Sequence, residues 1–94
     1  MFVITLRFKD KTQAGQLMDG HNAWIKRGFD DGVFLMVGSL QPNAGGVIFA
    51  HGATQADVDA RVMRDPFVAE GVVSAEILAV APGRIDERLA FLKA

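Results

Sequence analysis

The sequence predicts an α+β domain with the element order β-α-β-β-α-β, in which both helices cover one face of an antiparallel sheet. Runs with strand character alternate with runs of helical spacing, and glycine or proline clusters separate them. The chain has 94 residues, of which 50% are hydrophobic and 22% charged. A chain of this size is expected to form a single domain over residues 1–94.

The first half of the chain predicts a strand, a long helix and a second strand. Residues 2–8 alternate apolar and polar side chains, as a strand with one buried face does. A helix is expected over about residues 12–31, with Thr12 as its cap and Gly32 just beyond its end. Its apolar stripe consists of Ala14, Leu17, Met18, Trp24, Ile25 and Phe29. The apolar run 33–40 predicts a strand, which we expect at the centre of the sheet.

The second half predicts a strand that returns antiparallel, a second helix and a last strand. Turn-forming residues over 41–45 lead to an apolar run over 46–51, so the two strands form a hairpin. Thr54, with Asp57 three residues on, is a variant of the capping box and predicts a helix start. The buried side of this helix is assigned to Val58, Val62 and Met63.

Proline ends the second helix, and the chain closes with a strand and a short helix. Asp65-Pro66 interrupts the hydrogen-bond ladder, although residues 67–70 can add a turn. Residues 72–81 are rich in Val, Ile, Leu and Ala and predict the final strand. The remaining extension, residues 82–94, has apolar side chains on one side and predicts a short helix.

Composition argues against several kinds of partner and favours self-association. The net charge is -1 and the basic residues are scattered, so no nucleic-acid partner is expected. The amino terminus has neither a basic leader nor a long apolar run, and the chain has no cysteine, so we expect a cytoplasmic protein without a membrane segment. Because the strands over 33–40 and 72–81 are apolar on both faces, we expect a homodimer that covers the sheet.

Two titratable residues stand near predicted buried faces. His21 lies four residues after Leu17 and three before Trp24, which places it on the stripe of the first helix. It is either a packed histidine bonded to a backbone carbonyl or a functional group. Asp65 precedes Pro66 at a helix end, where a capping role is the simpler interpretation.

Glycines and a hydroxyl mark one end of the predicted hairpin. Gly38, Ser39 and Gly45-Gly46 can line a cavity there, although a glycine-rich turn explains the same residues. The second histidine, His51, is expected at the surface. With two histidines and no thiolate, we expect no metal site and no cofactor.

An ordered set of short motifs resembles the YCII-related (YciI-like) family over nearly the whole chain. The set is His21, Gly32, Gly38-Ser39-Leu40-Gln41-Pro42, Gly45-Gly46-Val47-Ile48, Asp65-Pro66-Phe67-Val68 and Gly71. The chain departs from the family pattern at Ser39, where many relatives have proline; here the proline follows at Pro42. This departure alters the rim of the expected pocket.

The resemblance implies a ferredoxin-like fold assembled into a dimeric α/β barrel, with His21 and Asp65 as the catalytic pair. We assign Gly38, Ser39 and Phe67 to substrate binding. A carboxylate bonded to one imidazole nitrogen fixes the tautomer and leaves the other nitrogen able to accept a proton near neutral pH. The expected function is proton transfer, as a lyase or isomerase, on a small cyclic or hydroxylated aromatic substrate. The alternative is a non-catalytic module that binds a small ligand or a protein.

Overall fold

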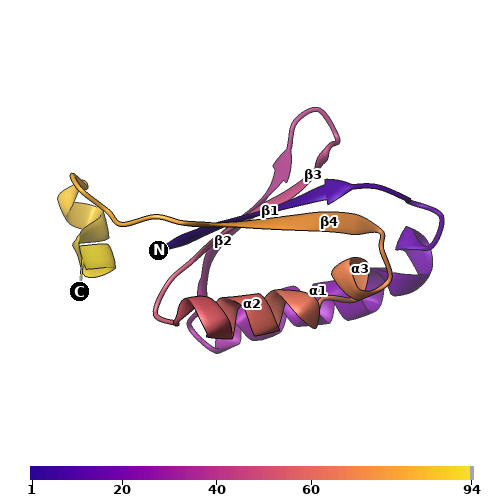
Figure 1. Cartoon of the computed structure of the whole chain (residues 1–94), viewed down its shortest axis with the longest axis horizontal. Helices are drawn as coiled ribbons and strands as arrows, with labels where there is room; N and C mark the ends of the chain where they lie inside the picture. The colour runs from indigo at the N-terminus through magenta and orange to yellow at the C-terminus, as the bar shows by residue number, and fades with distance from the viewer. Residues whose placement is uncertain (94) are drawn as a thin grey trace.

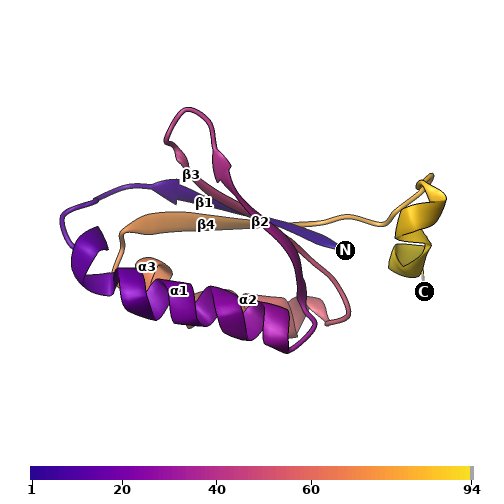
Figure 2. The ribbon, with the colours of Figure 1, turned by 180° about the vertical axis from the view of Figure 1, so that it is seen from behind.

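The computed structural model describes residues 1–93 and has the expected α+β class and order of elements (Figure 1). The elements are β1 (Phe2–Phe8), α1 (Ala14–Asp30), β2 (Phe34–Leu40), β3 (Gly45–Ala50), α2 (Gln55–Met63), α3 (Pro66–Ala69), β4 (Val73–Ala79) and the 3₁₀ helix η1 (Glu87–Lys93). The four strands form one antiparallel sheet with the order β2-β3-β1-β4. Both long helices lie on one face of this sheet, and the other face, here called the open face, carries no helix (Figures 1 and 2).

The expectation that the strand over 33–40 is central was wrong, because β2 is an edge strand that pairs only with β3. A bulge between Phe34 and Met36 explains its unbroken apolar run. Phe34 pairs with Ala50 and Val37 pairs with Ile48, and both partners are buried on the helix-facing side. The unbroken apolar run of β2 therefore comes from its bulge and from apolar side chains on both of its faces. Such a run does not indicate a central position in the sheet.

The start of α1 also differs from the expectation, since the helix begins at Ala14 and Thr12 does not cap it. Both the hydroxyl and the backbone N–H of Thr12 donate to Asp10 Oδ1. The hydrogen bond from the Thr12 side chain holds the pKa of Asp10 below its usual value. Thr12 thus forms a local turn with Asp10 and is not available to cap the helix.

The predicted start of α2 and the break after it are confirmed. Thr54 Oγ1 accepts the N–H of Asp57 at 3.1 Å, as an N-cap does. Asp65 is the N-cap of α3, with Pro66 at the first helical position. The final strand is shorter than the expected 72–81, and the expected terminal helix over 82–94 is a 3₁₀ helix in the described part.

The core lies between the sheet and the helices. Its buried apolar members are Ile4, Leu6, Trp24, Val33, Phe34, Ile48, Ala50, Val58, Val62, Phe67, Val72 and Val73. Three residues assigned to buried helix faces, Met18, Phe29 and Met63, are exposed instead. Met63 lies in the last turn of α2 and is 63% exposed, because the sheet side of that turn is already covered by Val62. Within residues 1–93, no helix is long and apolar enough to cross a membrane.

A glycine sets how closely α1 approaches β2. Gly28 is buried in the last part of α1, and a Cβ atom there would lie 2.1 Å from Cδ2 of Phe34. The Phe34 ring therefore occupies the space of the missing side chain, where it also meets the Trp24 ring edge-on at 5.1 Å. Trp24 in turn donates from Nε1 to the carbonyl of Arg61, which links α1 to α2. The packing of three elements depends on this one glycine.

We predict that Gly28→Ala lowers the free energy of unfolding by about 1–3 kcal/mol, because the added methyl group must displace the Phe34 ring. Gly15→Ala on the same helix is the matched control, since a Cβ at Gly15 meets nothing within 4 Å. That control should be neutral or stabilising by up to about 1 kcal/mol. Urea denaturation of both variants measures the difference, and equal stabilities would contradict this account of the α1–β2 contact.

Candidate active site

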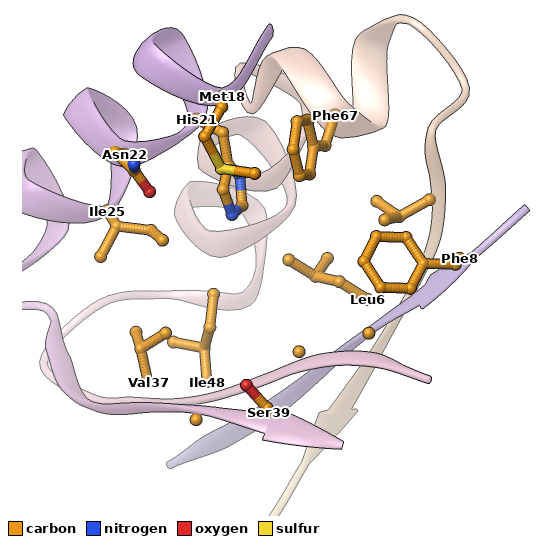
Figure 3. Close-up of a pocket in the computed structure, with 14 residues that line it drawn as sticks. Leu6, Phe8, Met18, His21, Asn22, Ile25, Val37, Ser39, Ile48 and Phe67 are labelled. Carbon is orange, nitrogen blue, oxygen red and sulfur yellow. The ribbon is translucent and has the colours of Figure 1, made fainter. Parts of the chain in front are cut away.

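A cavity of about 300 Å³ lies between the helix layer and the sheet. Its walls come from β1, β2 and β3 on the sheet side and from α1 and α3 on the helix side, with Val73 of β4 at one edge. Figure 3 shows the ring of His21 extending from α1 into this space, between Met18 and Phe67. Val37 and Ser39 of β2 lie across the cavity from His21 (Figure 3).

The hydrogen bond expected between His21 and Asp65 is present. His21 Nδ1 lies 2.8 Å from Asp65 Oδ1, and the two residues are 44 positions apart in the chain. The side chain of Asp65 is fully buried, whereas that of His21 retains 13% exposure. The pair therefore spans the boundary between the core and the cavity, with the carboxylate on the buried side.

The local fold of the chain fixes the Asp65 carboxylate. Asp65 is the N-cap of α3, and its Oδ1 accepts the backbone N–H of Phe67 at 3.0 Å as well as the bond with His21. The capping role and the site role proposed for this residue are thus not alternatives, because a single oxygen serves both. Its other oxygen, Oδ2, is buried and has no hydrogen-bond partner within residues 1–93.

Aromatic packing holds the plane of the His21 ring. The ring of Phe67 stacks on it with centroids 4.0 Å apart and planes 5° from parallel. The Trp24 ring lies further off, at 6.0 Å and 25°. Because the hydrogen bond sets one ring nitrogen and Phe67 sets the ring plane, the imidazole has little freedom to turn. Phe67, assigned to substrate binding from the sequence, thus also contacts the histidine directly.

The remaining predicted site residues also line the cavity. Gly38 and Ser39 are on β2, and on β3 Gly46 pairs with Ser39 while Gly45 pairs with Leu40. Gly45 has φ +136°, and a Cβ there would lie 1.8 Å from the carbonyl oxygen of Leu6. Only glycine fits this position, so the Gly45-Gly46 pair keeps the rim of the cavity free of side chains where β3 meets β1.

Asn22 and Met18 are among the lining residues that were not assigned to the site from the sequence. Asn22 follows His21 on α1 and brings an amide to the cavity, and Met18 lies one turn earlier on the same helix (Figure 3). Met18 was assigned to the apolar stripe, and its partial exposure is explained by the cavity beside it. The helical periodicity could have predicted both, because Met18 and Asn22 lie on the same side of His21 on a helical wheel.

The cavity wall is mostly apolar, and its polar groups are few. No Lys, Arg, Asp or Glu is among the described residues that line it. The polar side chains there are the imidazole of His21, the amide of Asn22 and the hydroxyl of Ser39. Across residues 1–93, no group of three or more His, Cys, Asp or Glu side chains is placed to hold a metal ion. His51 lies elsewhere, at the end of β3, where its ring meets that of Phe91.

Comparison with known proteins agrees with this architecture. A solved structure of 5-chloro-2-hydroxyhydroquinone dehydrochlorinase from Burkholderia phenoliruptrix AC1100, in complex with 2,5-dihydroxybenzoquinone, superposes with a TM-score of 0.62 at 14% identity. The match covers 88% of this chain and 96% of that one, and it shows a shared fold. No curated protein sequence matches the chain. The model of the YCII-related domain matches residues 1–81, and the chain therefore belongs to the YCII-related family.

Proposed function

We propose that the cavity is the active site of a small-molecule enzyme in which His21 is the general base and Asp65 orients it. The observation that carries the proposal is the placement of the pair: a fully buried carboxylate bonded to one nitrogen of an imidazole whose ring lines an apolar cavity. A carboxylate accepts hydrogen bonds and cannot donate them, so His21 Nδ1 carries the proton. Nε2 is then the nitrogen with a free lone pair.

The chemistry that follows is proton transfer at Nε2. Nε2 takes a proton from a hydroxyl or an activated carbon of the substrate, and Asp65 stabilises the resulting imidazolium. The electron pair left on the substrate either expels a leaving group or takes back the proton at a different atom. The first outcome is an elimination and the second an isomerisation. Neither requires a covalent intermediate.

The cavity wall favours a small hydroxylated cyclic substrate. Apolar walls and the stacked His21 and Phe67 rings suit a flat ring, while Asn22 and Ser39 can bond its hydroxyl or carbonyl groups. The absence of Lys and Arg from the described lining disfavours phosphorylated compounds. The dehydrochlorinase that shares the fold acts on such a ring and was solved with 2,5-dihydroxybenzoquinone, which supports this choice.

We further propose that the protein is a homodimer formed through the open face of the sheet. The strand registers place Leu78, Val3, Phe49 and Met36 side by side in one row across all four strands. Phe49 and Leu78 are exposed. The neighbouring row is more polar, with Glu76 opposite Thr5. The sequence had led us to expect that β4 is apolar on both faces, and at Glu76 it is not. The apolar row is the part of this face that a second copy would bury.

We predict that His21 is in the Nδ1–H tautomer when neutral, because Asp65 Oδ1 accepts that proton. Nitrogen-15 NMR of the imidazole groups identifies the protonated nitrogen. In Asp65→Asn the preference should weaken, since an amide can donate as well as accept. His51, which has no carboxylate partner in residues 1–93, is the internal control and should be unaffected. An Nε2–H tautomer of His21 in the unsubstituted protein would contradict the proposed role.

We predict that His21→Asn lowers turnover by about 10²–10⁴-fold, which is the usual contribution of a general base. A screen of hydroxylated aromatic compounds and lactones by ligand-induced thermal stabilisation would supply the substrate. Consumption of the compound, and its exchange of hydrogen for solvent deuterium, are then followed by proton NMR. His51→Asn is the matched control, because His51 lies outside the cavity, and it should retain full turnover. Full turnover by His21→Asn would contradict the general-base role of His21, and a compound that binds the unsubstituted protein without being converted would favour the binding module.

We predict that Phe49→Asp converts the dimer to a monomer, because it places a charge in the apolar row of the open face. Met63→Asp introduces the same charge at an exposed position on α2, on the helix side of the molecule, and should remain dimeric. Light scattering at micromolar concentration distinguishes the two states. A monomeric unsubstituted protein would end the proposal of a dimer.

A further inference from the structure

The last residues of the chain form an arm that leaves the fold. After β4 ends at Ala79, the chain continues without helix or strand until it reaches η1. We call residues 80–93 the C-terminal arm. Figures 1 and 2 show η1 standing clear of both the sheet and the helix layer, near the end of the molecule where the amino terminus lies. No residue of η1 is buried, and Leu89 and Phe91 are 45% and 47% exposed.

The contacts between the arm and its own fold are few. Val80 exchanges backbone hydrogen bonds with Met1, which extends the β1–β4 pairing by one residue. Further along, the Phe91 ring meets the His51 ring edge-on at 5.3 Å. Between the arm and the end of the fold lies a hollow of about 450 Å³, lined by Met1, Phe2, His51, Gly52, Ala53, Phe91 and Leu92. The residues on both sides of this hollow are mostly apolar. The arm therefore does not pack closely against its own fold.

The arm continues the apolar surface of the open face. Side chains alternate along β4, so Leu78 and the next residue but one, Val80, lie on the same face, and both are exposed. The apolar row proposed as the dimer interface thus extends along the edge of the sheet to the first residue of the arm. The arm from residue 82 onward lies beyond residues 1–81, which the family model matches.

We propose that the C-terminal arm packs against the second copy of the chain, which buries the apolar side chains of Leu89 and Phe91. This inference rests on the proposed dimer, and it adds a contact that the sheet faces alone would not make. In a two-fold dimer the exchange is reciprocal, so two arms contribute to one interface. Each arm then covers apolar area that would otherwise stay in water.

The first test removes the two exposed apolar side chains of the arm, of which Phe91 also meets His51 in its own chain. Leu89→Ser combined with Phe91→Ser should raise the dimer dissociation constant at least about tenfold, because each buried apolar side chain is worth about a factor of ten. Glu87→Ser combined with Lys93→Ser is the control on the same helix, and it should leave the constant unchanged. Sedimentation velocity at several concentrations gives the dissociation constants, and circular dichroism shows that both variants are folded.

The second test detects the contact directly. Mixed dimers of carbon-13-labelled and unlabelled chains should give isotope-filtered nuclear Overhauser effects between the Phe91 ring of one chain and protons of the other. A dimer that lacks these effects and keeps its dissociation constant in the double serine variant would overturn the arm contact and leave the sheet-mediated dimer standing. A monomeric unsubstituted protein would overturn both, so the two failures are distinguishable.

Discussion

The candidate site depends on one buried carboxylate oxygen. Asp65 Oδ1 accepts the N–H of Phe67 at the start of α3 and also meets His21 on α1, 44 positions earlier in the chain, so it joins the two helices. Because Phe67 follows two residues later, the same turn delivers the ring that stacks on His21. The turn at Asp65 therefore sets the direction of α3, the hydrogen bond to the imidazole and one wall of the cavity together. Loss of that oxygen would remove the cap of α3 and the bond to His21 at once.

The space for a ligand depends on a position of the sheet that has no side chain. Where β2 and β3 pass beneath His21, Gly46 pairs with the buried Leu6 and with Ser39, so a helix-facing position of the sheet has no side chain there. Gly28 does the opposite at the far end of α1, where its missing side chain is occupied by Phe34. Glycine thus opens the layer between helix and sheet at one end and closes it at the other. The cavity lies where the helix-facing positions of β2 and β3 carry the small residues Ser39 and Gly46.

Much of this was predictable from local patterns, and the failures have both local and long-range causes. Thr54 and Asp65-Pro66 marked helix boundaries correctly because capping and proline geometry depend on neighbours in the sequence. The prediction that Thr12 caps α1 was wrong because Thr12 is hydrogen-bonded to Asp10. The edge position of β2 and the role of Gly28 depend on pairing and packing between distant segments, which periodicity does not encode. His21 and Asp65 were paired through the family resemblance, since spacing alone left both with simpler interpretations.

The uncharged wall of the cavity has a consequence for the kinetics of ligand entry. Since no described lining residue is a Lys, Arg, Asp or Glu, the wall has no permanent charge to draw an ionic ligand from a distance. Association would then proceed at the ordinary diffusional rate for a neutral pair, with little dependence on ionic strength. Selectivity would arise after encounter, from desolvation and shape. Abundant cellular anions would neither compete strongly for this cavity nor be concentrated by it.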